Sequence, residues 1–193
     1  MLAPWRSALK SAIHRNRSKP YSRYFQLATI TPEGLPANRT VVFRGFLDDE
    51  NNQLKIVTDL RSSKIRDIEH QSQGSACWYF TKTREQFRIL GQLQLVTATE
   101  TDSHLQKARK TTWYNLSEPA RSQFAWPDPA QPAADPSAFE IEPPNSDTPL
   151  DNFCLLLLTP RKVDLLQLKS EPQKRYLYTQ SEDSTWEISS INP

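Results

Sequence analysis

The chain has 193 residues, of which 37% are hydrophobic and 24% are charged, and its formal net charge is +2. This length suits one domain, expected over 1–193, with a full hydrophobic core. No apolar run approaches the roughly 20 residues that a membrane-spanning helix needs, so we expect no membrane span. The near balance of charges gives no argument for nucleic-acid binding by itself.

Cysteine and glycine usage excludes several common classes of site. Cys77 and Cys154 are the two cysteines, and they are too far apart in sequence to form a metal-binding pair. We therefore expect no metal site and a reducing, cytoplasmic location. The four glycines form neither a G-x-G-x-x-G dinucleotide motif nor a Walker loop. Common nucleotide-fold and hydrolase signatures are thus absent.

The first 20 residues are predicted to form a helix. Pro4 stands where a helix begins, and Trp5, Leu9, Ala12 and Ile13 recur at helical spacing. Residues 1–32 contain six Lys or Arg and no acidic residue, a composition that also occurs in transit peptides. We favour an amphipathic helix that covers the sheet following it.

From residue 24 the hydrophobic period changes to two, which indicates β-strands. Helices are predicted at 62–71, with Ser62 or Ser63 as its cap, at 101–116, with Thr101 or Asp102 as its cap, and at 117–125. Short strands dominate, so we predict a mainly β fold, a closed or nearly closed antiparallel barrel. The expected strands are 24–31, 37–46, 53–58, 75–81, 86–99, 152–159, 161–168, 175–179 and 185–191.

Residues 126–149 separate the last helix from the last strands and hold seven of the 15 prolines. The segment, with its Pro-rich loop at 127–149, is longer than ordinary connections between elements. We expect it to be functional, mobile or both.

Three segments carry candidate site residues. In a strand, Arg39 and Arg44 point to opposite faces. The segment from Thr58 to Lys64 combines a strand end, a turn and a helix start with hydroxyls and cations, which is typical of a phosphate site. Gln86 and Arg88 share one face of a long strand, where a glutamine could bind a polar heterocycle. The plainer alternatives are solvated arginines, an ordinary helix N-terminus and a solvent-facing polar row.

The order of these segments resembles the FMN-binding split barrel of the pyridoxamine 5′-phosphate oxidase family. The matching stretches are Arg39-x-Val41, Ser62-x-Lys64, Arg84-x-Gln86 with Gly91, Ser117-x-Pro-x-x-Ser-Gln123, and Arg175-Tyr-Leu-Tyr178 followed by Trp186. The resemblance covers about 20–193. It implies an antiparallel split β-barrel with peripheral helices, an FMN cofactor, and a homodimer that shares each FMN at the subunit interface.

The resemblance also implies roles for individual residues. The strand from Arg39 to Val42 would follow the flavin ring and ribityl chain, Lys64 would bind the phosphate, and Arg175 would close over the ring. Gln86 would come from the second subunit. A looser register places Tyr114, Ser122 and Trp126 near the substrate. With the phosphate-site composition, the expected cofactor residues are Arg39, Thr40, Val41, Val42, Arg44, Val57, Thr58, Ser62, Ser63, Lys64, Gln86, Arg88 and Arg175.

The sequence departs from the family pattern mainly where a substrate would bind. Ser63 replaces an arginine, Glu118 lies near the position of a substrate arginine, Leu166 replaces a tryptophan, and Pro172 and Gln173 lie near a late Arg-x-His pair. Losing such cations weakens the binding of a substrate phosphate, because charge-assisted hydrogen bonds contribute roughly 1.5–3 kcal/mol each. No catalytic residue is assigned.

We therefore expect an FMN-binding oxidoreductase of this type, acting on a small molecule for which pyridoxamine or pyridoxine 5′-phosphate is a candidate. The main alternative is a flavin-binding carrier or sensor without catalysis. A nucleic-acid module is not favoured, because the aromatic residues lie mostly at core-like spacing rather than on a basic face. The expected partners are a second copy and a small molecule, with neither nucleic acid nor membrane.

Overall fold

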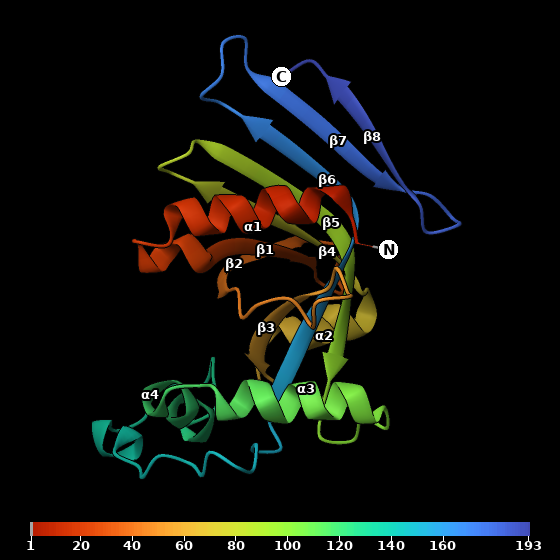
Figure 1. The fold of residues 1–193 in the computed structure, drawn as a ribbon. Helices are drawn as coiled ribbons and strands as arrows, with labels where there is room; N and C mark the ends of the chain where they lie inside the picture. Colours follow the sequence, from red (N-terminus) through yellow and green to blue (C-terminus); the bar gives the residue numbers. More distant parts are fainter. Residues whose placement is uncertain (1) are drawn as a thin grey trace.

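The computed structural model describes residues 2–193, and it is built around one antiparallel sheet of eight strands (Figure 1). The strands follow the order β2-β1-β4-β5-β6-β7-β8, and β3 pairs with β6 off this path. Their bounds are β1 Tyr24–Ile30, β2 Pro36–Val42, β3 Leu54–Asp59, β4 Gln73–Phe80, β5 Glu85–Val96, β6 Phe153–Gln167, β7 Lys174–Gln180 and β8 Trp186–Ile191. The mainly β, split-barrel prediction is confirmed.

Helices lie around the sheet. Helix α1 crosses one side of it, α3 and α4 lie at one end, and the β7–β8 hairpin extends at the other (Figure 1). Within residues 2–193, no helix is long and apolar enough to cross a membrane. The bounds are α1 Pro4–Asn16, α2 Lys64–His70, α3 Ser103–Tyr114 and α4 Glu118–Ser122, with short 3-10 helices η1 Pro20–Arg23, η2 Gln123–Ala125 and η3 Pro136–Phe139.

The strands form an open sheet rather than the closed or nearly closed barrel expected from the sequence. Strands β2 and β3 share no regular ladder, but the chain after β2 follows β3 closely. Arg44 donates its backbone N–H to the carbonyl of Lys55 at 2.8 Å, and Lys55 donates back to Gly45 at 2.8 Å. These bonds place Arg44 at the point where the chain after β2 lies beside β3.

The predicted N-terminal helix is confirmed, and its apolar side is part of the core. Trp5, Leu9 and Ala12 are fully buried, together with strand residues such as Trp78. Arg6 anchors the start of the helix by donating to the carbonyl oxygens of Asp49 and Asp48 at 2.7 and 2.6 Å.

Two local predictions were wrong. The strands expected at 152–159 and 161–168 form the single strand β6, because the register shift of β5 beside Gly91 accommodates Pro160 within the ladder. Proline lacks the N–H that a regular ladder needs, so it is tolerated at such irregularities.

The second wrong prediction concerns the cap of α2. Ser63 precedes α2 but makes no side-chain cap, and Ser62 makes none either. Asp102, by contrast, caps α3 as expected.

A separate aromatic cluster attaches α3, α4 and η2 to the ends of β3 and β6. Trp113, Leu116, Phe124 and Phe153 are buried against one another. The ring centroids of Phe124 and Phe153 lie 5.1 Å apart in an edge-on arrangement. This packing fixes the helical segment opposite β2 and β3, which leaves a cleft between them.

Candidate functional site

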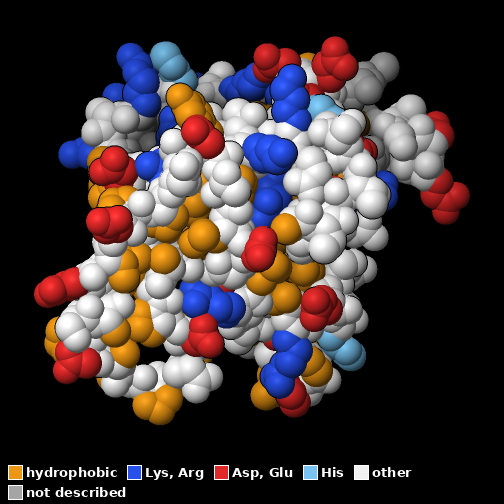
Figure 2. Space-filling model, turned by 90° about the horizontal axis from the view of Figure 1, so that it is seen from below, with side chains coloured by type: hydrophobic (Ala, Val, Ile, Leu, Met, Phe, Trp, Pro, Cys, Tyr) orange, Lys and Arg blue, Asp and Glu red, His pale blue; other side chains and the backbone are white. Residues whose placement is uncertain are grey.

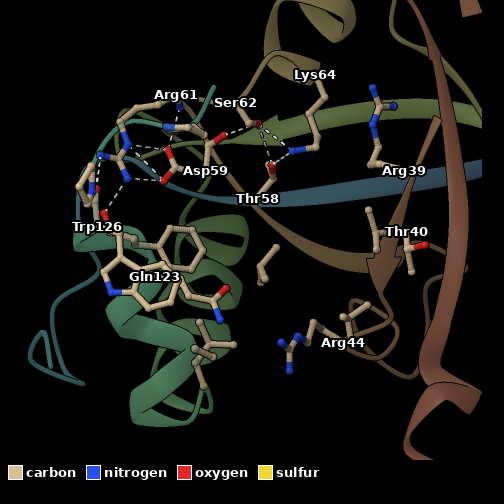
Figure 3. Close-up of a pocket in the computed structure, with 18 residues that line it drawn as sticks. Arg39, Thr40, Arg44, Thr58, Asp59, Arg61, Ser62, Lys64, Gln123 and Trp126 are labelled. Carbon is tan, nitrogen blue, oxygen red and sulfur yellow. Dashed lines mark hydrogen bonds and ion pairs between the residues drawn. The ribbon is translucent and has the colours of Figure 1, made fainter. Parts of the chain in front are cut away.

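A cleft of about 480 Å³ lies between β2, the end of β3, the start of α2 and the α4–η2 segment (Figure 3). Figure 2 shows hydrophobic side chains gathered around basic ones on the face of the molecule that carries α3 and α4. Pockets of this size are typical of small-ligand sites. The lining residues are Arg39, Thr40, Val41, Val42, Arg44, Val57, Thr58, Asp59, Arg61, Ser62, Lys64, Leu116, Ala120, Gln123, Phe124, Trp126, Pro127 and Pro129.

A cluster of hydroxyls and one ammonium group forms the upper part of the cleft in Figure 3. Lys64 Nζ donates to Thr58 Oγ1 at 3.0 Å and to Ser62 Oγ at 2.8 Å. Burial, helped by the charge of Arg39, lowers the pKa of Lys64. No carboxylate within residues 2–193 forms an ion pair with this ammonium group. An anion in the cleft would therefore meet a partly desolvated cation and two hydroxyls.

Arg39 is held by a buried network behind the cleft. Its guanidinium donates to Thr29 Oγ1 at 2.6 Å and lies 3.3 Å from Asp67 Oδ2. Thr29 in turn donates to the same carboxylate oxygen at 2.7 Å. Because Asp67 is only 3% exposed, this network fixes the direction of the Arg39 side chain at the cleft.

Arg44 is a second cation, on the opposite side of the cleft from Lys64 (Figure 3). The side chain is half-buried, and its buried Nε finds no hydrogen-bond partner within the described part of the chain. Burial and the nearby charge of Arg23 lower the pKa of Arg44. A buried charge without a partner is costly, so a ligand anion here would relieve that cost.

Arg61 was not among the predicted site residues, although it is one of the two cations of the Thr58–Lys64 segment. It forms a two-point contact with Asp59, with Arg61 NH2 to Asp59 Oδ2 at 2.7 Å, and it also reaches the η2 segment. Asp59 was missed as well. The signal was the Asp59-x-Arg61 spacing at the end of a strand, where a turn brings two oppositely charged side chains together.

The structure brings ten of the sixteen predicted site residues to the cleft. Gln123 also lines it and was missed, although it ends the Ser117-to-Gln123 motif. Tyr114, Ser122 and Ser63 do not line the cleft. Tyr114 is 61% exposed, the Ser122 hydroxyl donates to the carbonyl of Glu118, and Ser63 is exposed. The ten are Arg39, Thr40, Val41, Val42, Arg44, Val57, Thr58, Ser62, Lys64 and Trp126.

The remaining three predicted residues form a second group, on the outer face of β5 and β7. Gln86 and Arg175 both stand opposite Leu166 of β6 in the ladder. Asp164 accepts hydrogen bonds from Arg88 at 2.5 Å and from Arg175 at 2.9 and 3.1 Å. These residues do not line the cleft of their own chain.

Known proteins resemble the chain in sequence and in fold. The profile of the family described as pyridoxamine 5′-phosphate oxidase, FMN-binding domain, matches residues 2–97. The Arabidopsis thaliana protein named pyridoxine/pyridoxamine 5′-phosphate oxidase 2 is 37% identical over 195 residues, which cover 100% of this chain and 98% of that protein.

Solved structures show the same likeness in three dimensions. A pyridoxamine 5′-phosphate oxidase-related, FMN-binding protein from Nostoc punctiforme superposes with a TM-score of 0.96 at 51% identity, with 100% of both chains covered. PhzG from Burkholderia lata, solved with tetrahydrophenazine-1-carboxylic acid, shares the fold at a TM-score of 0.79 and 17% identity, covering 100% of this chain and 98% of that one. The chain therefore belongs to the pyridoxamine 5′-phosphate oxidase family of FMN-binding domains.

Proposed function

We propose that the protein is an FMN-dependent oxidoreductase that oxidises a small phosphorylated substrate. The observation that carries this proposal is the pair of cations on opposite sides of one cleft, Lys64 and Arg44, neither of which has a carboxylate partner within residues 2–193. Two such groups suit two anions, one on the cofactor and one on the substrate. The name of the Arabidopsis relative supports pyridoxamine or pyridoxine 5′-phosphate as the substrate.

The residues of the cleft fit FMN. Lys64, Thr58 and Ser62 supply a cation and two hydroxyls for a phosphate. Val41, Val42 and Val57 add apolar atoms to the lining of the cleft, which suits a flat ring. When bound, FMN supplies an acceptor for two electrons and a proton from the substrate.

We further propose that a second copy of the chain completes each site. Gln86, Arg88 and Arg175 carry donors suited to a flavin ring, yet they stand on the outer face of the sheet rather than in the cleft. Asp164 holds the two arginines together there. In a homodimer in which this outer face covers the partner's cleft, the residues of the face and the residues of the cleft would contact the same ligand. The two free cysteines support a reducing, cytoplasmic location.

The reaction can be written in balance for both candidate substrates. Pyridoxamine 5′-phosphate, O₂ and water would give pyridoxal 5′-phosphate, ammonia and hydrogen peroxide. Pyridoxine 5′-phosphate and O₂ would give pyridoxal 5′-phosphate and hydrogen peroxide. The protein would position the substrate carbon beside the flavin, while the cations on both sides fix the two phosphates.

The test begins with the visible absorption spectrum of the purified protein and the release of its chromophore by denaturation. We expect a two-banded flavin spectrum, release of FMN, and formation of pyridoxal 5′-phosphate with an equal amount of hydrogen peroxide. A colourless protein that does not take up added FMN would refute the proposal. An FMN-loaded protein that oxidises neither substrate would refute the activity and leave the cofactor assignment standing.

A complementation experiment tests the shared site. Lys64→Met removes a residue of the cleft, and Arg175→Ala removes one of the outer face. Each variant alone should lose FMN affinity, whereas mixed dimers should regain one intact site in two. No recovery on mixing, in a sample shown by mass spectrometry to contain mixed dimers, would contradict the proposal. A monomer in sedimentation experiments would also contradict it.

A carrier or sensor is the second candidate function, and one observation favours it. Among the described residues that line the cleft, Asp59 is the one carboxylate, and Arg61 and Asn152 already occupy it. A single chain thus offers no free general base beside the ligand. FMN-loaded protein that is reduced slowly by every amine and nicotinamide donor offered would support this candidate.

A further inference from the structure

Arg61 ties the α4–η2 side of the cleft to the end of β3. Its guanidinium donates to the carbonyl oxygens of Phe124 at 3.0 Å and Trp126 at 2.9 Å, and to Asp128 Oδ1 at 2.8 Å. The hydrogen bonds to Asp59 hold the guanidinium in place and raise the pKa of Arg61. We call residues 124–128 the cleft wall. The Arg61 side chain therefore holds three of these five residues, at positions 124, 126 and 128.

A second side chain reinforces the same attachment. Asn152 Nδ2 donates to Asp59 Oδ2 at 2.9 Å and to the carbonyl of Phe124 at 2.8 Å. Phe124 is 8% exposed and packs in the aromatic cluster below the cleft. The wall is therefore held by polar bonds on one side and by apolar packing on the other.

Trp126 presents its ring to the cleft from this wall (Figure 3). Phe139 of η3 supports the ring from the Pro-rich loop, with the ring centroids 5.6 Å apart at 75°. The loop is anchored beyond this contact as well, because Trp113 Nε1 donates to the carbonyl of Asn145 at 2.9 Å. Arg109 likewise donates to the carbonyl of Leu150 at 2.8 Å. The Pro-rich loop thus supports the wall through Phe139, and the chain beyond that contact is attached to α3.

We propose that Arg61 is a positioning residue that fixes the cleft wall, and that the ring of Trp126, placed by it, retains FMN in the cleft. An apolar ring that covers bound FMN slows its release by keeping water from the covered surface. The retention role requires the wall to be rigid. Three hydrogen bonds from the Arg61 guanidinium to residues 124, 126 and 128 hold the wall, and three more to Asp59 hold the guanidinium itself. This inference rests on FMN as the ligand but is independent of the substrate.

The experiment measures the dissociation rate of FMN from loaded protein, using the recovery of flavin fluorescence on dilution. Trp126→Ala and Arg61→Ala should each release FMN about tenfold faster. Trp126→Phe keeps an aromatic ring and should stay within about twofold of the unmodified protein. Arg66→Ala removes an exposed arginine whose partner is Glu33, and as the matched control it should change nothing.

The double variant separates positioning from a merely structural role. If Arg61 acts through Trp126, Arg61→Ala with Trp126→Ala should release FMN no faster than either single variant. Backbone amide exchange of 124–128 should rise in Arg61→Ala while β1 and β4 stay protected. Asp128→Ala removes only an exposed partner of Arg61 and keeps the test valid if Arg61→Ala does not fold. It should also raise both the rate of FMN release and the amide exchange of 124–128.

Three results would overturn the proposal. Unchanged FMN release from Trp126→Ala would show that the ring does not retain the cofactor. Strictly multiplicative effects in the double variant would show that Arg61 acts elsewhere. Unchanged exchange of the wall in the Arg61 and Asp128 variants would show that these bonds do not fix it. None of these readouts uses substrate turnover, so failure of the proposed activity would be seen separately.

Discussion

Asp67 Oδ2 lies 3.3 Å from the guanidinium of Arg39, which joins helix α2 to strand β2 at the back of the cleft. The side chain of Asp67 is 4% exposed and that of Arg39 is 22% exposed. Removing one partner of a buried ion pair leaves the other charge uncompensated. The pair therefore affects both the stability of the fold and the direction of Arg39.

The first prediction concerns this pair. Asp67→Asn should lower the free energy of unfolding by about 2–3 kcal/mol, because Arg39 keeps its charge in a partly buried place. Urea denaturation at pH 7 measures the change. Glu69→Gln, on the exposed side of the same helix, is the matched control and should stay within about 0.5 kcal/mol. Equal stability of the two variants would contradict the structural role of Asp67.

The second prediction concerns the cluster of Lys64, Thr58 and Ser62 in the cleft. Lys64→Met should raise the dissociation constant of FMN by about 10- to 100-fold, because a cation–phosphate bond contributes roughly 1.5–3 kcal/mol. Equilibrium titration of flavin fluorescence measures it. Riboflavin, which lacks the phosphate, should bind the variant and the unmodified protein equally. A parallel loss of riboflavin binding would show that Lys64 contacts another part of the ligand, and Lys107→Met, on the exposed side of α3, controls for lost surface charge.

The third prediction concerns the close approach of β5 and β6. A Cβ on Gly91 would lie 2.2 Å from the carbonyl oxygen of Thr159, which is backbone and cannot move aside. Gly91→Ala should therefore destabilise the fold by more than about 3 kcal/mol or prevent folding. Gly34→Ala is the contrast, because Gly34 has φ +78° but open space around it. Gly34→Ala should lower the free energy of unfolding by only about 1–2 kcal/mol. Thermal or urea denaturation of the two variants measures the difference.

The sequence predicted the elements well where one signal dominated. Alternating apolar residues located most strands. The turn from Thr58 to Lys64 predicted a phosphate site because all of its groups are close in sequence. The cleft wall could not be found in this way. Arg61 meets Trp126 and Asp128, 65 and 67 residues further along the chain, and only the folded packing of Phe124 on Phe153 brings them together. The outer-face residues near Arg175 were located on their strands, but no pattern in the sequence shows whether they contribute to a cleft.

The fourth prediction concerns pH and the outer face of the sheet. Burial raises the pKa of Asp164, but the hydrogen bond from Arg175 and the charge of Arg88 outweigh it, so the net pKa lies below 3.8. A carboxylate with a lowered pKa stabilises the folded state above its unfolded pKa, and this contribution is lost as the pH falls through the folded pKa. Asp164→Asn should therefore be less stable than the unmodified protein by about 1–2 kcal/mol at pH 7, since both arginines are partly exposed.

The pH profile distinguishes this ion-pair effect from a packing effect. The difference in unfolding free energy between Asp164→Asn and the unmodified protein should be constant from about pH 5 to 8 and should shrink as the pH falls below about 4. Urea denaturation at a series of pH values measures it, with Glu182→Gln, an exposed acid before β8, as the control. A difference that persists undiminished at the lowest pH would mean that Asp164 stabilises the fold by shape rather than by its charge, and that Arg88 and Arg175 are held in place by other contacts.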